Sequence, residues 1–292
     1  MAIRLITRDE VIKNSKSLPV FPIILNQILN TIADPDANMH VLANYVKSVP
    51  VMTSRVLAVV NMKASERQRP IISDISVAIS LLGMGSIREL ALISSTGNFV
   101  KNIELAGAPS LYWQHSIAVG VCGQELARHM SYSNKVAESA MIAGLLHDIG
   151  KIWLLNFYPE ATPIIFKQKH SDKISLCEAE KNYFGVDHAT VGGWLAEYWS
   201  QPADIVAAVR YHHSPDLALS HTLVPLVHVA EILSNALDLT GRIENRVTKA
   251  STPAFKALGL IWGDISRPKF TELFGRMEAR SHYASMLFDS AH

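Results

Sequence analysis

Residues 144–151 read Gly-Leu-Leu-His-Asp-Ile-Gly-Lys, so a histidine, an aspartate and a lysine follow a run of apolar residues. Residues 134–143, which precede this stretch, carry apolar side chains at helical spacing, and we expect a helix over residues 134–147. His147 would end this helix, and Asp148 would follow it directly. The stretch therefore predicts a helical fold in which an imidazole and a carboxylate lie together at a helix end.

The rest of the chain carries the same helical signals, whereas the apolar and polar alternation of strands is almost absent. Three pairs fit the capping box, in which a hydroxyl residue is followed three positions later by glutamate: Thr7 with Glu10, Ser86 with Glu89, and Ser175 with Glu178. Gly83-Met84-Gly85 is interpreted as a helix-to-helix turn. We predict an all-α fold with helices over residues 22–33, 38–48, 50–62, 74–82, 86–101, 110–130, 134–147, 160–170, 175–184, 188–199, 202–213, 222–239 and 266–287.

The composition is that of a packed protein without a global charge. Of the 292 residues, 49% are hydrophobic and 18% are charged, which excludes a disordered chain. Lys and Arg number 27 and Asp and Glu 26, so nothing global attracts nucleic acid or an anionic membrane. Two cysteines cannot form a disulfide framework, and no run approaches the roughly 18 apolar residues of a membrane span. We expect a cytoplasmic protein that binds neither nucleic acid nor membrane.

Two polar stretches predict a division of the chain into three parts. Residues 102–110 contain Gly107 and Pro109 and separate an N-terminal half from a half that holds most of the twelve histidines. A second polar stretch begins at Thr240, before the last predicted helix. The predicted parts are residues 1–104, a histidine-rich helical bundle over 105–240, and a C-terminal helical extension over 241–292.

Histidines and acids at the predicted helix ends suggest a metal site. The sequence contains no Walker A loop, HExxH, GxSxG or paired CxxC motif. A helical bundle could direct its imidazoles and carboxylates into one cavity. Asp148 is the natural bridge, since a carboxylate can give one oxygen to each of two ions. We expect one or two divalent transition metals, with iron or manganese ahead of nickel and zinc, held by His115, His147, Asp148, His188, His212, His213 and Glu231.

The stretch over residues 144–151 resembles the signature of the HD superfamily of metal-dependent phosphohydrolases, and His115 matches its first histidine. Preceding segments resemble the HDOD family, the HD-related output domains of bacterial signalling proteins: Leu18-Pro19-Val20-Phe21-Pro22, Val49-Pro50 with Leu57 to Asn61, and Ala78-Ile79-Ser80-Leu81-Leu82-Gly83. The likeness spans about residues 15–235. It implies a multi-helix HD-type bundle with an N-terminal helical subdomain.

Three departures separate the chain from the related HD-GYP phosphodiesterases. Leu111 stands where their first glutamate ligand would be, and Glu231 replaces a late aspartate. Ser214-Pro215-Asp216 follows His213 in place of a Gly-Tyr-Pro motif. The resemblance therefore implies that this chain does not hydrolyse cyclic-di-GMP.

Three functions compete at this point. The first is a bacterial HDOD-type regulatory protein that retains the metal site, has little or no catalysis, binds a phosphate-containing small ligand and acts on a signalling protein in trans. The second is a metal-dependent phosphohydrolase with Asp148 and Lys151 in catalysis; Lys151 would either meet a phosphate or neutralise Asp148. The third is a helical scaffold without metal. We favour the first.

Overall fold

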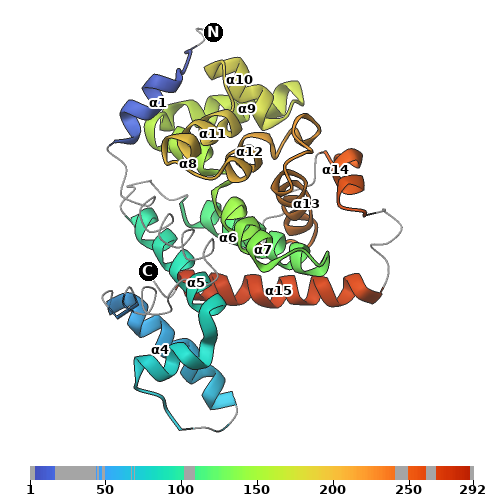
Figure 1. Cartoon of the computed structure of the whole chain (residues 1–292). Helices are drawn as coiled ribbons and strands as arrows, with labels where there is room; N and C mark the ends of the chain where they lie inside the picture. The colour runs from blue at the N-terminus through green and yellow to red at the C-terminus, as the bar shows by residue number, and fades with distance from the viewer. Residues whose placement is uncertain are drawn as a thin grey trace. The chain divides into compact units, whose positions relative to one another are not determined.

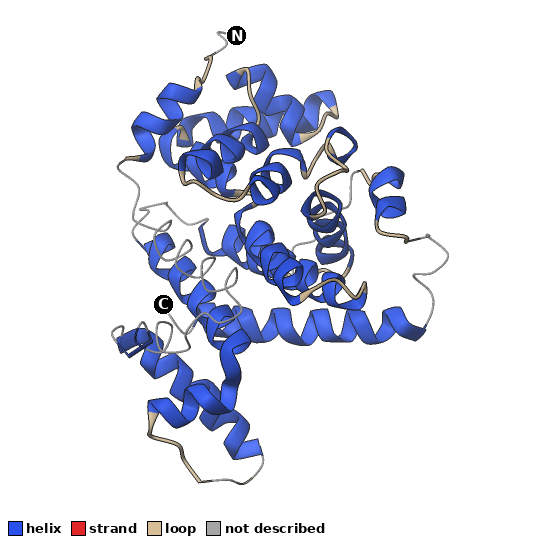
Figure 2. Cartoon of the chain, in the orientation of Figure 1, coloured by secondary structure: helices blue, strands red, loops and turns tan. Residues whose placement is uncertain are grey.

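The computed structural model describes residues 4–16, 44, 46–47, 50–66, 68, 70–101, 109–240, 249–260 and 268–289. These residues form helices, short 3₁₀ turns and loops, and none of them forms a strand (Figure 2). The predicted all-α class is confirmed. Within the same residues, no helix is both long and apolar enough to cross a membrane.

Within residues 109–236 the helices follow one another with short connections (Figure 1). Contacts group the chain into two compact units, residues 1–18 with 103–282 and residues 19–102 with 283–292. The elements are α1 (Arg8–Ser15), α4 (Pro50–Glu66), α5 (Ile75–Lys101), α6 (Pro109–His129), α7 (Asn134–Leu146), α8 (Ile149–Phe157), η1 (Pro159–Ala161), α9 (Thr162–Asp172), α10 (Leu176–Phe184), α11 (His188–Tyr198), α12 (Ala203–Tyr211), η2 (Pro215–Leu217), α13 (Leu223–Ala236), α14 (Thr252–Ala257) and α15 (Pro268–Asp289).

Local signals account for several helix ends. Before α10, the hydroxyl of Ser175 accepts from the backbone N–H of Glu178, whose carboxylate accepts from the backbone N–H of Ser175, so this capping box is confirmed. Thr7 likewise caps α1, which the predicted ranges omitted. Gly83 has φ 76° and ψ 162° inside α5, which confirms the predicted turn between two helical segments.

Other helices differ from the prediction. The sequence analysis missed α8 because its residues are almost all apolar, and a helix without a polar face shows no periodicity. It also missed α14, which has only 6 residues. The predicted helix over 22–33 lies outside the described residues, as does most of the one over 38–48.

Two close backbone approaches position the histidine-bearing helices. A Cβ on Gly144 of α7 would lie 2.6 Å from the Cα of Gly120 on α6, so only glycine allows these helices to pack this closely. A Cβ on Gly150 of α8 would lie 1.9 Å from the carbonyl oxygen of His188, at the start of α11. The start of α8, next to Asp148, is thereby held against the start of α11.

The segments at both ends of the compact unit around residues 103–282 are tied to its helices. Trp153 of α8 donates through Nε1 to the hydroxyl of Ser15 in α1, at 3.2 Å. On α15, Arg276 donates through Nε to the buried carboxylate of Glu125 on α6, at 2.9 Å. By their contacts, residues 1–18 and 249–282 group with the histidine-rich bundle. The three-part division stays a prediction.

Candidate metal centre

Most of the predicted ligand residues stand at helix ends that meet in one place. His147 closes α7, Asp148 precedes α8, His188 begins α11, and His212 closes α12. His115 lies within α6, and Glu231 lies within α13.

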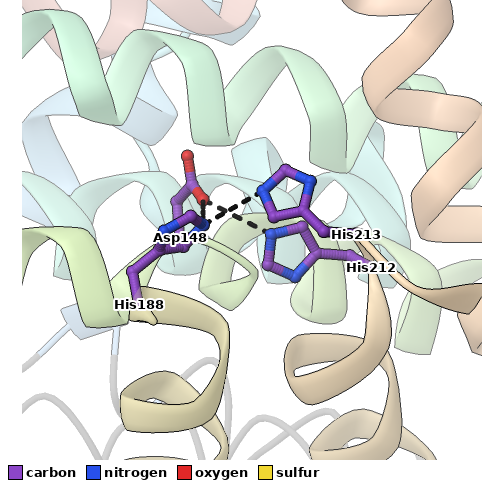
Figure 3. Close-up of side chains that lie close together, drawn as sticks. All are labelled: Asp148, His188, His212 and His213. Atoms are coloured by element: carbon purple, nitrogen blue, oxygen red, sulfur yellow. Dashed lines mark hydrogen bonds and ion pairs between the residues drawn. The ribbon is translucent and has the colours of Figure 1, made fainter. Parts of the chain in front are cut away.

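Asp148 is at the centre of the cluster and is 1% exposed. Its Oδ1 lies 3.5 Å from Nε2 of His188 and 3.6 Å from Nε2 of His212 (Figure 3). Its Oδ2 lies 3.5 Å from Nε2 of His147. These separations are too long for good hydrogen bonds. The carboxylate therefore faces three imidazole nitrogens across a gap in which a cation could bind.

The ligand atoms form two groups that share Asp148. The inner group is His115, His147 and Asp148, and the outer group is Asp148, His188, His212 and His213. Within each group the ligand atoms all lie within 4.8 Å of one another. One aspartate common to two groups is the arrangement expected of a bridging carboxylate.

Several buried atoms in the cluster lack a hydrogen-bond partner in the structure. They are Nδ1 of His115, Nε2 of His147, Nε2 of His212 and Oδ1 of Asp148. Leaving a buried polar atom unsatisfied costs about 1–3 kcal/mol. A cation would satisfy imidazole lone pairs and a carboxylate oxygen at once, so these residues fit a metal ion of the nitrogen- and oxygen-binding kind.

Backbone carbonyls fix the tautomers of two histidines. Nδ1 of His147 donates to the carbonyl oxygen of Gly144, and Nδ1 of His212 donates to that of Val209, each at 2.7 Å. A carbonyl can only accept, so the proton is on Nδ1. In the neutral ring, Nε2 then carries the lone pair that a metal needs.

Glu180 on α10 fixes His188 in the same way, and the sequence analysis missed it. Its Oε2 accepts from the backbone N–H of His188 at 2.9 Å and from the ring Nδ1 at 2.6 Å. No spacing motif marks this glutamate, because the loop before α11 brings it to His188. The Sγ of Cys177 lies near the same two residues, but burial raises the pKa of its thiol, which disfavours the thiolate.

The electrostatics favour the metal-binding form of His147, His213 and Asp148. For His212, in contrast, burial is outweighed by the interaction with Asp148, which raises the pKa. Burial lowers the pKa of His147 to about 4, so its ring is neutral near pH 7. Burial and then the neighbouring His212 hold the pKa of His213 well below its usual range. Burial would raise the pKa of Asp148, but His147 and Lys151 outweigh it and keep the carboxyl ionised.

Lys151 contacts the carboxylate of Asp148, and its side chain is 15% exposed. Its Nζ lies 2.7 Å from Oδ2 of Asp148. Burial lowers its pKa, but the attraction of Asp148 and then Glu231 outweighs burial, so the net shift is upward and the amine stays charged. Of the two roles expected for Lys151, this geometry provides neutralisation of Asp148 directly.

Glu231 lies at the edge of the cluster. Its Oε2 is 3.9 Å from Nδ1 of His213, and it belongs to neither ligand group. The structure thus brings together six of the seven predicted ligand residues, with Glu231 adjoining one of them. Their role as ligands stays a prediction. The backbone of Leu111 is part of α6, and its side chain lies outside the described residues.

His228 supports the turn that carries His212 and His213. Its Nδ1 donates to the carbonyl oxygen of His212 at 2.6 Å, and its Nε2 accepts from the backbone N–H of Ser251 at 3.1 Å. Both ring nitrogens are therefore used, and His228 is 4% exposed. It contacts a proposed ligand residue through the backbone and is not itself in either group.

Comparison with known proteins shows which family this chain is similar to. The pattern of the HDOD domain family matches residues 18–215, which is more than half of the chain. A protein of uncharacterised function from Treponema pallidum (strain Nichols) is 22% identical over 197 residues. The match covers 68% of this chain and 38% of that protein, so the chain spans well under half the length of this relative.

Solved structures share the fold. An HDOD domain protein of unknown function from Geobacter sulfurreducens is 23% identical, with a TM-score of 0.76 and 98% of both chains covered. A candidate phosphohydrolase from Shewanella amazonensis SB2B is 21% identical, with a TM-score of 0.66 over 96% of this chain and 97% of that one. A candidate signal transduction protein from Marinobacter aquaeolei VT8 is 22% identical, with a TM-score of 0.72 over 98% and 63%.

Proposed function

This chain belongs to the HDOD family, and we propose that it is a regulatory protein built around a retained HD-type metal centre, with little or no catalysis of its own. Iron or manganese would be held in the inner and outer groups and bridged by Asp148, with nickel and zinc as the alternatives. A phosphate-containing small ligand and a signalling protein in trans would be its partners, in the cytoplasm.

The observation that carries the proposal is the set of partnerless buried atoms that face one another. Nε2 of His147 lies 3.5 Å from Oδ2 of Asp148, and Nε2 of His212 lies 3.6 Å from its Oδ1, while Nδ1 of each histidine is committed to a backbone carbonyl. Without a metal, nothing would offset the free energy cost of burying these atoms with no hydrogen-bond partner. A helical scaffold without metal is therefore disfavoured.

A metal-dependent phosphohydrolase is the second candidate, and the shared Asp148 favours it. When bound, a divalent metal supplies a means of lowering the pKa of water toward neutrality. The chain's own contribution would be to hold Asp148 ionised and to place the Lys151 amine beside it. Against this candidate, the carboxylate expected one turn before His115 is replaced by Leu111, and no Gly-Tyr-Pro sequence follows His213.

Elemental analysis and turnover measurements on the same purified protein separate these functions. We expect at least one iron or manganese ion per chain, and no hydrolysis of cyclic-di-GMP. Slow hydrolysis of a generic phosphoester would depend on added metal and would vanish in His147→Ala. A chain that binds no metal when supplied with either ion would contradict the proposal. Turnover of a specific nucleotide above about 1 s⁻¹ would favour the phosphohydrolase instead.

A further inference from the structure

A small apolar cavity lies beside the metal centre, between α8, α9 and α10. Its volume is about 30 Å³. The residues that form its apolar wall are Leu154, Leu155, Ile165, Phe166, Leu176 and Phe184. None of these residues belongs to either ligand group.

The cavity shares two residues with the surroundings of the metal centre. Lys151 and Glu180 both line it. Nζ of Lys151 is 2.7 Å from Oδ2 of Asp148, so the charged end of the cavity adjoins the proposed bridging carboxylate. Oε2 of Glu180 is committed to His188. Lys151 is the only cationic side chain among the residues that line the cavity.

We propose that this cavity binds the short apolar substituent of a small organic oxyanion, whose charged group contacts Lys151 beside the metal centre. The inference rests on the metal centre proposed above and names the class of ligand that it takes. An ammonium group and a metal ion select an oxyanion such as phosphate or carboxylate. The apolar wall then selects among oxyanions by the size of their apolar substituent.

The volume limits the size of the substituent. A single water needs about 10–15 Å³, so a cavity of about 30 Å³ admits a chain of one or two carbon atoms and no aromatic ring. Burying one CH₂ group contributes about 0.8 kcal/mol, which corresponds to an approximately fourfold gain in affinity. Affinity should therefore rise from inorganic phosphate to ethyl phosphate and stop rising at longer chains.

Calorimetric titration of the full chain, loaded with manganese, tests this directly. The probes are inorganic phosphate, methyl, ethyl and butyl phosphate, with acetate and propionate as the carboxylate arm. We expect about a fourfold gain per carbon up to ethyl in whichever arm binds. Equal affinity along both series would overturn the proposal, as would an absence of oxyanion binding by metal-loaded protein.

Three variants separate the cavity from the metal centre. Ala161, which is 1% exposed and lines the cavity, would become Val; Ala161→Val should remove the gain per carbon and leave inorganic phosphate binding intact. Ala207→Val is the matched control, since Ala207 lines a separate hollow on α12. Lys151→Met should weaken the binding of every oxyanion in both series. A chain-length gain that Ala161→Val leaves unchanged would place the substituent elsewhere and contradict the proposal.

Metal content, measured on each sample, keeps the two proposals apart. If the protein contains metal and shows no chain-length dependence, the cavity proposal fails and the metal centre stands. If it contains no metal, the proposed function fails. The alkyl phosphate series then still decides the cavity, because Lys151 and the apolar wall remain. Unfolding of Ala161→Val, visible by circular dichroism, would leave the series on the unmodified chain to decide.

Discussion

The two ligand groups around Asp148 differ in their access to solvent. In the inner group, His115 is 9% exposed and His147 is fully buried. In the outer group, the side chain of His213 is 31% exposed, and its Nε2 lies 3.0 Å from Nε2 of His188. One aspartate thus joins an enclosed group to a group that opens toward water.

The groups also differ in how many ligand residues they contain and in what holds them. The inner group has three, on the closely packed helices α6 and α7 and at the start of α8, and Leu111 offers no carboxylate to complete it. The outer group has four, and the carboxylate of Glu180 orients one of them. We infer that the outer group binds metal more tightly and that its exposed side is where ligands exchange.

The largest effect should come from the residue that the groups share. Asp148→Ala should weaken metal binding at both groups by more than about 100-fold, the upper end of the range for residues that only orient a ligand. Elemental analysis after dialysis measures the loss, and helical circular dichroism checks that the chain remains folded. Asp172→Ala, an exposed aspartate at the end of α9, is the control. Unchanged metal content in Asp148→Ala would show that Asp148 binds no metal.

Removing one histidine from each group should reduce metal binding at one site and spare the other. His115→Ala should remove only the weaker metal, because the four residues of the outer group remain. His212→Ala should weaken the tighter site and leave the inner group. Titration of the metal-free protein with manganese gives the number of sites and their dissociation constants. Equal losses from both variants would show that a single ion spans the two groups.

Glu180→Gln should act on the outer group alone. Its carboxylate holds the ring of His188 through Nδ1, and losing such a partner typically weakens metal binding about 10–100-fold. Affinity at the inner group should not change. Glu178→Gln is a matched control on the same helix, since Glu178 caps α10 and is exposed. A loss of metal from the inner group in Glu180→Gln would contradict the separation of the two groups.

The sequence predicted which histidines and acids come together better than it predicted what holds them. His147, Asp148 and the pair His212 and His213 stand at helix ends that caps and periodicity reveal, and the structure brings them together. Glu180 and His228 act through contacts made by tertiary packing, which no local pattern encodes. The same holds for α8, because a helix buried on all sides has no polar face to mark its period.

Glycine shows the same division between local and tertiary signals. The turn at Gly83 could be predicted from the adjacent sequence, because glycine between two helical patterns can adopt the positive φ that such a turn needs. The need for glycine at position 150 comes from the carbonyl oxygen of His188, which is 38 residues away in the chain. The sequence therefore does not show why glycine is needed at position 150, because the requirement comes from the packing of α8 against α11.

The smallest effect on metal binding should come from the anchoring of α6, the helix that carries His115. Ten residues further along it, the buried carboxylate of Glu125 accepts from Arg276 at 2.9 Å and from Arg128 at 3.1 Å, and it also pairs with Arg280. Burial raises the pKa of Glu125, but hydrogen bonds from Arg276 and Arg280 outweigh burial and lower it overall.

A lowered pKa in the folded state means that the ionised carboxylate stabilises the fold. This stabilisation is complete above the unfolded pKa of about 4.3 and is lost as the pH falls through the lower pKa of the folded state. Glu125→Gln should therefore reduce the free energy of unfolding by about 1–3 kcal/mol at pH 7, and the difference should shrink below about pH 4. Urea denaturation at a series of pH values measures it. Metal affinity of both groups should stay unchanged, because roughly 15 Å of helix separates Glu125 from His115. A stability difference that persists undiminished at pH 3 would contradict the role given to the Glu125 charge.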